Sequence, residues 1–316
     1  MIETESASVQ FYLVSADLSG QRIDNFLITY LKGAPKSLIY RIIRKGEVRI
    51  NKKRCKPETK LAANDLIRIP PVRLSEPKEH LPSVKLNKVQ NIEQAILFED
   101  DALMVINKPS GLAVHGGSGL SFGLIEALRA LRPDAKFLEL VHRLDRDTSG
   151  CILVAKKRSA LRELHRMLRD KEVRKNYWCL VKGYWPDRRN KVQAKLLKNT
   201  LKSGERVVVI DDEGKDALTK FTVLQRLNGA TLMEAFPVTG RTHQIRVHCQ
   251  AAGHEIAGDP KYGDQFFSER MAQSGVERLF LHAHELIFKH PLSGDLLKIQ
   301  APLDKNLNKA VILLQK

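Results

Sequence analysis

The sequence has few cysteines, few aromatic residues and no long apolar run, and each shortage narrows what the chain can be. Its four cysteines lie far apart and form no C-x-x-C pair, which argues against a disulfide framework or a zinc site. No apolar stretch approaches the ~18 residues of a membrane-spanning helix, and the first residues are polar and acidic, unlike a secretion signal. We therefore expect a cytoplasmic protein with reduced cysteines and no bound metal.

Acidic residues are also in short supply, since 53 lysines and arginines face 36 aspartates and glutamates, for a formal net charge of +17. A basic excess of this size is typical of proteins that bind polyanions, with nucleic acid the first candidate and an acidic membrane the second. The excess is densest in residues 20–73, which contain 14 basic and 4 acidic residues, a net of +10. We expect this segment to be the main contact with a polyanion.

Apolar residues within the basic segment recur at helical spacing. Residues 21–32 and 37–45 each predict a short helix with one apolar face, and residues 48–50 and 66–69 predict strands. Most charge runs are solvated surfaces, but here the basic side chains lie opposite the apolar helix faces, which favours RNA binding. The expected RNA contacts are Arg41, Arg44, Lys45, Lys52, Lys53 and Arg54.

The length of 316 residues suits about two domains, each with its own core. Residues 74–93 lack apolar periodicity and contain two prolines among charged residues, which is typical of a linker. We therefore predict a tail at residues 1–19, an RNA-binding domain at 20–73, this linker, and a larger domain at 94–316.

The segment VHRLDRDTSG, residues 141–150, carries the strongest candidate for chemistry. It leads directly into residues 151–155, five apolar residues that predict a buried strand, and it places five ionisable groups within six positions. Neighbouring guanidinium groups favour the ionised form of a carboxylate, which points to Asp145 as a nucleophile or base. Taken alone, a surface ion-pair network explains the segment better, by about two to one.

Further motifs supply a turn, aromatic side chains and hydrogen-bond donors. NKPSG at 107–111 predicts a turn at the end of a strand, and HGGSG at 115–119 matches neither the GxxxxGK[ST] nor the GxGxxG pattern of nucleotide-binding loops. KNYWCLVKGYW at 175–185 predicts a strand whose aromatics either fill the core or stack on an unpaired base. TGRTHQIRVH at 239–248 predicts a donor-rich helix start, whose two histidines lack a third metal ligand. GDPKYGD at 258–264 predicts a loop.

Together these segments resemble the RluA-type pseudouridine synthase family. The likeness rests on HRLDRDTSGCILVAKK, NKPSGLAVHGG, RKNYWCLVKG, PVTGRTHQIRVH and RLFLHAHEL, while GQRIDNFL, SLIYRIIRKGEVRINKKR and LAANDLIRI resemble an S4 domain. It runs over nearly the whole chain in the same order. The resemblance implies an α+β fold, in which a small S4-like RNA-binding domain precedes a catalytic domain with a mixed, largely antiparallel sheet flanked by helices.

The resemblance also implies roles for particular residues. Asp145 would be the catalytic aspartate, attacking or deprotonating the target uridine, and Arg241 would pair with it and keep it ionised. Tyr177 would stack on the flipped uracil, and Arg143 would fill the space that the base leaves. His142 and Lys108 are further expected contacts with the RNA or its loop, Lys108 as a residue that positions the loop.

The implied reaction isomerises uridines of 23S ribosomal RNA without a cofactor, in a protein that works as a monomer and binds no membrane. Three alternatives stay open. A non-catalytic RNA-binding protein would need no aspartate at 145. A metal nuclease could use Asp145 and Asp147, although no third acidic cluster supports it. A pseudouridine synthase for transfer RNA or another RNA would carry the same catalytic motifs.

Overall fold

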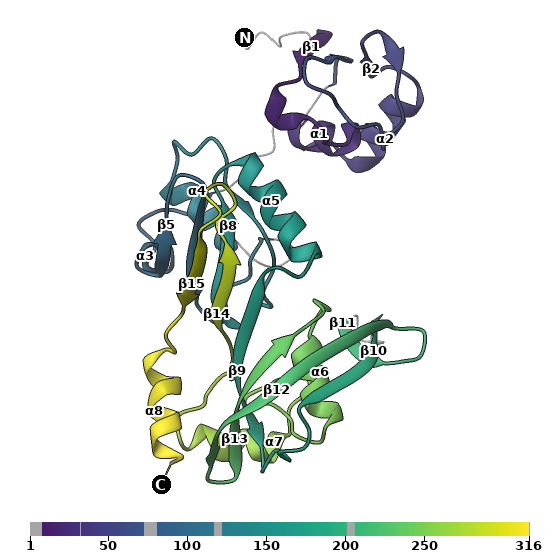
Figure 1. Cartoon of the computed structure of the whole chain (residues 1–316). Coiled ribbons are helices and arrows are strands. Elements are labelled where there is room, and N and C mark those ends of the chain that lie inside the picture. The colour runs from purple at the N-terminus through teal and green to yellow at the C-terminus, as the bar shows by residue number, and fades with distance from the viewer. Residues whose placement is uncertain (1–7, 32, 73–80, 117–121, 201–205, 316) are drawn as a thin grey trace, which may run out of the picture. The chain divides into compact units, whose positions relative to one another are not determined.

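The computed structural model describes residues 8–31, 33–72, 81–116, 122–200 and 206–315, and every structural statement below concerns these ranges. The chain divides into two compact units, residues 1–80 and residues 81–316. Each unit has its own apolar core, and Figure 1 shows the helices and strands of each unit.

The first unit packs two helices against a small sheet. Helix α1 spans Ile23–Tyr30 and helix α2 spans Lys36–Arg44. The sheet has the order β1-β4-β2-β3; its strands are β1 (Gln10–Leu13), β2 (Arg49–Ile50), β3 (Lys53–Arg54) and β4 (Leu66–Ile69). The apolar positions that predicted the two helix faces form this core, chiefly Ile23, Phe26, Leu27, Ile39, Ile42 and Ile43.

Two ordered elements lie where the sequence predicted a tail and a linker. Strand β1 belongs to the expected tail, yet it pairs antiparallel with β4 along its whole length. Helix α3, Asn87–Gln94, begins inside the expected linker, and its apolar residues Val89 and Ile92 are fully buried. A single pair of apolar residues three apart is enough to anchor a short helix, which is too weak a pattern to stand out among polar residues.

The second unit is built on one extended sheet, with the order β11-β10-β12-β13-β9-β14-β8-β6-β5 and with β15 and β7 attached to β14 and β8. Among the described strands, β8 and β14 form the one parallel pair, which confirms a mixed, largely antiparallel sheet. Its strands are β5 (Ile96–Glu99), β6 (Leu103–Lys108), β7 (Glu139–Leu140), β8 (Ser149–Ala155), β9 (Arg174–Lys182), β10 (Lys191–Thr200), β11 (Arg206–Ile210), β12 (Lys215–Leu227), β13 (Ala230–Pro237), β14 (Leu281–Lys289) and β15 (Leu296–Gln300).

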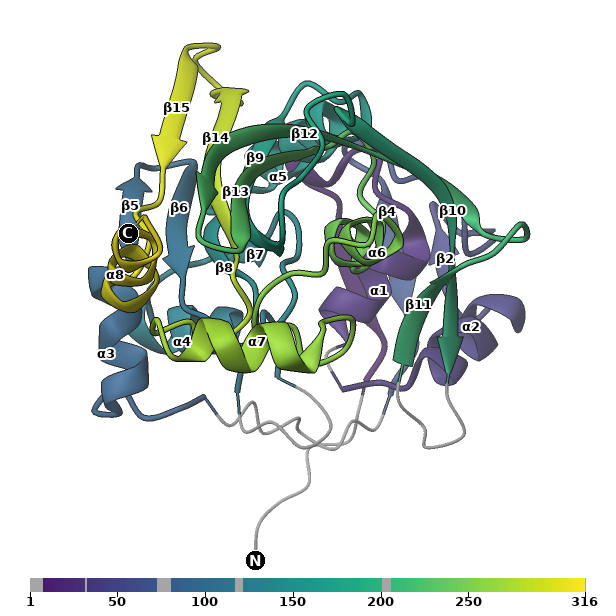
Figure 2. The same ribbon diagram turned by 90° about the horizontal axis from the view of Figure 1, so that it is seen from below.

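Helices flank this sheet, as the resemblance implied. They are α4 (Leu124–Leu131), α5 (Arg158–Arg169), α6 (Gln244–Ala251), α7 (Gln265–Ala272) and α8 (Lys305–Leu313). Figure 2 shows α6 on the concave side of the curved strands β10, β12 and β13, and it contacts each of them. Within the described ranges, every helix is too short or too polar to cross a membrane.

Candidate active site

The loop that carries Asp145 is anchored by the strand that follows it. All seven residues of β8 are buried, so the strand holds the end of the loop inside the core. Gly150 is required there, because its φ is +106° and a Cβ atom would lie 2.3 Å from the carbonyl oxygen of Ala283 in β14. Gly150 therefore allows β8 to run beside β14, and the loop that carries Asp145 lies just before this strand.

Lys108, at the end of β6, ties this loop to the neighbouring turn. Its side chain is fully buried, and Nζ donates three hydrogen bonds of 2.8–2.9 Å to backbone carbonyl oxygens. These oxygens belong to Pro109, Leu112 and Arg146. Burial lowers the pKa of Lys108 to about 7, although Asp147 and Asp145 oppose the shift. The loop-positioning interpretation of Lys108 thus agrees with its contacts, whereas a direct contact with RNA does not, because all its donors are used.

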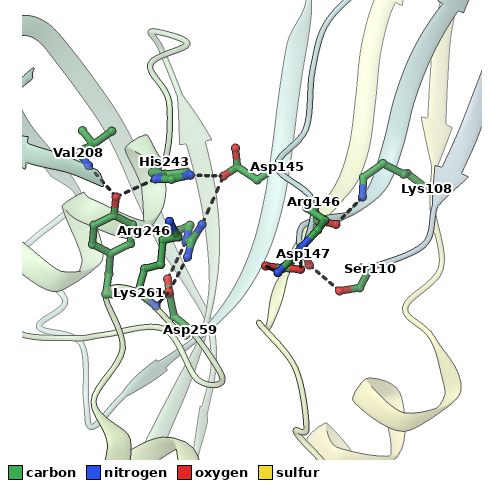
Figure 3. Close-up of polar contacts among 11 residues, drawn as sticks. Lys108, Ser110, Asp145, Arg146, Asp147, Val208, His243, Arg246, Asp259 and Lys261 are labelled. Atoms are coloured by element: carbon green, nitrogen blue, oxygen red, sulfur yellow. Dashed lines mark hydrogen bonds and ion pairs between the residues drawn. The ribbon is translucent and has the colours of Figure 1, made fainter. Parts of the chain in front are cut away.

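Two further contacts join the same turn to the Asp145 loop. The hydroxyl of Ser110 donates to the carbonyl oxygen of Asp147 at 2.7 Å, and the amide of Gly111 donates to that of Arg146 at 2.9 Å (Figure 3). The carboxylate of Asp147 forms an ion pair with Arg146, whose Nε lies 2.9 Å from Oδ1. Arg146 and Asp147 therefore shape the loop, and Asp145 is the carboxylate that faces open space.

Asp145 opens into a cleft of about 360 Å³ on the concave side of the sheet. The cleft brings together five side chains that the sequence proposed from three separate motifs. They are His142, Arg143, Asp145, Tyr177 and Arg241. A volume of this size lies within the range of small-molecule pockets, so the cleft can accept a single nucleoside.

The arginine that faces Asp145 is Arg246, which corrects the expected pairing with Arg241. The Nη1 atom of Arg246 lies 3.7 Å from Oδ2 of Asp145. Arg241 is exposed at the edge of the cleft, and its Nε donates to the carbonyl oxygen of Asp216 at 3.2 Å. Helix α6 begins only at Gln244, so Arg241 lies in the preceding loop, whereas Arg246 is on the buried face of the first turn.

A second carboxylate holds Arg246 in place. Two nitrogens of the guanidinium bind both oxygens of Asp259, at 2.7 and 2.6 Å, and both side chains are buried. Burial opposes the ionisation of Asp259, but its hydrogen bonds with Arg246 outweigh burial and keep the pKa of Asp259 below its ordinary value. Bidentate pairing fixes the plane of a guanidinium, so the third nitrogen of Arg246 is aimed at Asp145.

His243 is the other group that contacts Asp145. It is the residue before α6, in a left-handed conformation with φ of 52°. Its Nε2 lies 3.8 Å from Oδ2 of Asp145, and its Nδ1 lies 2.7 Å from the hydroxyl of Tyr262. Burial lowers the pKa of His243, so the ring is neutral near pH 7. From the sequence, His243 belongs to a donor-rich helix start and lacks the partners of a metal ligand, and neither interpretation predicts its contact with Asp145.

Two residues of β9, Tyr177 and Lys175, line the cleft. Tyr177 is 9% exposed. Trp178 instead stacks on His284, with ring centroids 3.7 Å apart. Burial, reinforced by the negative charge of Asp145, raises the pKa of Tyr177, so its hydroxyl stays protonated. Lys175 also lines the cleft, and burial lowers its pKa. The preference for Tyr177 over Trp178 as the aromatic of the site agrees with this geometry.

His142 and Arg143 differ in what they are free to do. The Nε2 atom of His142 accepts a hydrogen bond of 3.2 Å from the amide of Leu153, and burial lowers the pKa of His142 to about 3. The ring is therefore neutral and braces the loop against β8, which argues against the predicted contact with RNA. Arg143 is exposed at the cleft, where its guanidinium can reach a substrate.

The basic side chains predicted to bind RNA all lie on the surface of the first unit. Arg41, Arg44, Lys45, Lys52, Lys53 and Arg54 are exposed. Asn51 and Lys52 adopt positive φ values of 48° and 68°, which produces the tight turn between β2 and β3. The turn presents its lysines to solvent at the end of the hairpin, where they can contact a phosphate backbone.

Comparisons with known proteins agree with these observations. A family model described as RNA pseudouridylate synthase matches residues 102–251, and an S4 domain model matches residues 21–67. The "Ribosomal large subunit pseudouridine synthase C" of Pasteurella multocida is 63% identical over 303 residues, which cover 96% of this chain and 93% of the relative. The protein of the same name from Escherichia coli is 59% identical over 312 residues, with 98% of both chains covered.

A solved structure shows the same likeness. "Human RNA Pseudouridylate Synthase Domain Containing 4" superposes with a TM-score of 0.58 and 26% identity, over 72% of this chain and 95% of that protein. The chain is thus an S4-containing, α+β RNA-modifying enzyme. It belongs to the RNA pseudouridylate synthase family, as its motifs indicated, and its substrate is RNA.

The residues that the sequence missed share one pattern. Arg246 and His243 lie three apart at the start of α6, and the residues that contact them, Asp259 and Tyr262, lie three apart in the GDPKYGD segment. In the sequence, TGRTHQIRVH predicts a donor-rich helix start, and GDPKYGD predicts only a loop. The equal spacing was visible, but nothing in the sequence says that the two segments meet.

Proposed function

We propose that this chain converts specific uridines of large-subunit (23S) ribosomal RNA to pseudouridine, in the cytoplasm, with Asp145 as the catalytic residue. One observation carries the proposal: a carboxylate on a braced loop faces a nucleoside-sized cleft, with a buried arginine aimed at it. The curated relatives covering nearly the whole chain carry the name ribosomal large subunit pseudouridine synthase, which supports the choice of RNA.

The reaction accounts for the composition of the cleft. Pseudouridine forms when the C1′–N1 bond breaks and a C1′–C5 bond replaces it, so the atoms balance within one nucleotide and no electrons are gained or lost. A base stacked in a helix cannot turn in this way, and enzymes that act on such bases flip them into a pocket. The cleft beside Asp145 is the cavity that would hold the flipped uridine.

The side chains around the cleft fit distinct roles in this reaction. Asp145 would act on the uridine through its carboxylate, which the buried guanidinium of Arg246 faces at 3.7 Å. Tyr177 would pack against the uracil and keep a protonated hydroxyl near it. Arg143, exposed at the edge of the cleft, would fill the gap left in the RNA.

The exposed basic residues of the first unit would supply affinity. Lysines and arginines at phosphates give binding that depends on salt more than on sequence. Because the chain carries both an RNA-binding domain and a catalytic domain, we propose that the protein acts as a monomer. The uridine is then chosen by the cleft and its edge, while the first unit holds the RNA.

The direct test is pseudouridine mapping by carbodiimide labelling and primer extension on large-subunit ribosomal RNA that lacks the modification. We expect new stops with the wild-type protein and none with Asp145→Asn, in reactions without added metal or cofactor. Asp147→Asn is the matched control, because it removes a carboxylate from the same loop and should keep most of the activity.

Three results would contradict this proposal. Stops with Asp145→Asn would remove Asp145 from the catalytic role. Stops that appear only on transfer RNA would change the substrate and leave the chemistry intact. Silence of the wild-type protein on both RNAs, beside an active control enzyme, would favour a protein that binds RNA without modifying it.

A further inference from the structure

The loop Gly258–Gly263 contacts both groups that face Asp145, although it contributes no side chain to the cleft. Asp259 binds the guanidinium of Arg246, and Tyr262 contacts the ring of His243. Tyr262 also lies under the same guanidinium, 5.0 Å from its central carbon to the ring centroid. One loop therefore controls the orientation of both partners of the carboxylate.

The backbone of this loop is built for that contact. Oδ1 of Asp259 accepts hydrogen bonds from the amides of Lys261 at 2.9 Å and Tyr262 at 3.0 Å, so the residue that holds Arg246 also fixes the position of Tyr262. A Cβ atom at Gly263 would lie 2.3 Å from the carbonyl oxygen of Asp259. Only glycine permits this tight closure, which explains the pattern GDPKYG.

The hydrogen bonds of Tyr262 favour one position for the proton of His243. The amide of Val208 in β11 donates to the Tyr262 hydroxyl oxygen at 2.8 Å. The hydroxyl is left with one hydrogen, and the nearest acceptor is Nδ1 of His243 at 2.7 Å. When the hydroxyl donates to Nδ1, that atom carries no proton in a neutral ring, and the proton of His243 is then on Nε2, which faces Asp145.

Both partners of Asp145 approach the same oxygen. The closest contacts of His243 and Arg246 end on Oδ2, at 3.8 and 3.7 Å. Figure 3 shows the other carboxylate oxygen of Asp145 pointing away from them. A distance of 3.8 Å is longer than a hydrogen bond, and catalytic contacts often shorten when substrate binds. The arrangement leaves one oxygen of the carboxylate held and the other available to the uridine.

We propose that His243 is a positioning residue for Asp145, locked by Tyr262 in the tautomer that presents its Nε2 proton to Oδ2. The proposal rests on the proposed catalytic role of Asp145. In this arrangement a series of contacts runs from the amide of Val208 in β11 through Tyr262 and His243 to the carboxylate of Asp145 (Figure 3). The fixed backbone of β11 thereby helps to fix the position of the carboxylate. A purely structural role for His243, as the left-handed residue before α6, is the alternative that the experiment must separate.

Two substitutions at position 243 distinguish these roles, because they rank oppositely for them. The side-chain amide nitrogen of glutamine can take the place of Nε2, whereas that of the shorter asparagine can take only the place of Nδ1. Asparagine, in turn, tolerates a left-handed backbone better than glutamine does. A structural role therefore favours His243→Asn, and a positioning role favours His243→Gln.

We expect kcat on the RNA substrate to fall about 10- to 100-fold in His243→Asn and about threefold in His243→Gln, as for other residues that orient a reactive group. KM should stay unchanged in both, and thermal unfolding should rank His243→Asn as the more stable. Tyr262→Phe, which keeps the ring but removes the donor, should lose kcat about tenfold. Equal kcat values for the two variants at 243, or a loss confined to KM, would overturn the proposal.

A second measurement tests the tautomer without any reference to activity. Nitrogen NMR of ¹⁵N-histidine-labelled full-length protein would show Nδ1 of His243 unprotonated and Nε2 protonated, with the signal assigned by its absence in His243→Asn. Tyr262→Phe should change this distribution. Protonated Nδ1 in the wild-type protein would overturn the lock.

The two readouts separate this proposal from the one on which it rests. If Asp145→Asn stays active while the NMR result is as expected, the catalytic assignment fails and the tautomer lock stands. If Asp145→Asn is inactive while His243→Asn keeps wild-type kcat, the catalytic assignment stands and His243 has no positioning role.

Discussion

The two units of this enzyme use basic side chains in opposite ways. In the first unit, Arg41, Arg44, Lys52 and Lys53 are exposed and have no ion pair within the described residues. In the second unit, Lys108 and Arg246 are buried, and their donors point at oxygen atoms a few ångströms away. The comparison indicates that exposed charge is available to the phosphates of RNA, whereas buried charge sets the geometry around one carboxylate.

This difference has an energetic consequence. An exposed charge interacts weakly with its neighbours and is screened by salt, so its removal changes binding and leaves the fold intact. A buried charge is stable only with its partners, and removing one partner leaves the other without compensation. Substitutions of exposed basic residues in the first unit should therefore change RNA binding, and substitutions of buried basic residues in the second unit should change stability or kcat.

The largest effect is expected from a substitution of Arg246, for which Arg241 of the same GRTHQIR motif is the control. Arg246→Lys keeps the charge but loses the bidentate contact with Asp259, and a lysine cannot reproduce the fork of a guanidinium. We expect kcat to fall about 10³-fold, equivalent to about 4 kcal/mol. The matched variant Arg241→Lys should lose less than about fivefold, since Arg241 contacts only a backbone carbonyl. Steady-state kinetics on both variants, with circular dichroism to confirm folding, would check this.

The reverse ranking would restore the original prediction. If Arg241→Lys were the more damaged enzyme, Arg241 would be the partner of Asp145 when RNA is bound, and the contact of Arg246 would be structural.

The second prediction concerns stability. Lys108→Met removes three hydrogen bonds to carbonyl oxygens, and each such bond contributes about 0.5–1.5 kcal/mol. We expect the free energy of opening to fall by about 3 kcal/mol in peptides that cover residues 141–155, measured by hydrogen–deuterium exchange. Lys191→Met, at an exposed position of β10, should change it by less than about 0.5 kcal/mol. Equal protection in the two variants would show that Lys108 does not brace the loop.

The third prediction concerns how the free energy of unfolding depends on pH. Burial lowers the pKa of His282 to about 4, from an ordinary 6.5. The unfolded chain therefore takes up a proton that the folded chain refuses, and stability is present above pH 6.5 and is lost as the pH falls toward 4. His282→Gln should flatten this decline by about 1 kcal/mol per pH unit, measured by urea unfolding between those pH values. An unchanged slope would mean that the ring is protonated in the folded state.

The smallest effect is expected on the exposed side. The double variant Arg41→Gln, Arg44→Gln should bind RNA a few-fold more weakly, reduce the salt dependence of log K by about 1–2, and leave the unfolding transition unchanged. Filter binding at several salt concentrations would measure this. A loss of stability, or an unchanged salt slope, would contradict the view that these residues only attract RNA.

Much of the fold followed from local patterns in the sequence. The helix faces of the first unit and the buried strand after Asp145 were both visible as short periodic or apolar runs, because such patterns depend on residues close in sequence. Strand β1 and helix α3 were missed. Each is short and packs against a partner distant in sequence, β1 against β4 and α3 against α4.

By itself, the sequence determined the family, the S4-like and catalytic parts and the loop that carries Asp145, since these reside in contiguous motifs. Only the tertiary structure decided which arginine faces Asp145, that Lys108 is a buried brace, and that the GDPKYG loop holds both partners of the carboxylate. Arg241 and Arg246 are chemically identical and five residues apart. The residue at which α6 begins, and the packing of that helix against the loop, place one in solvent and the other beside the reactive group.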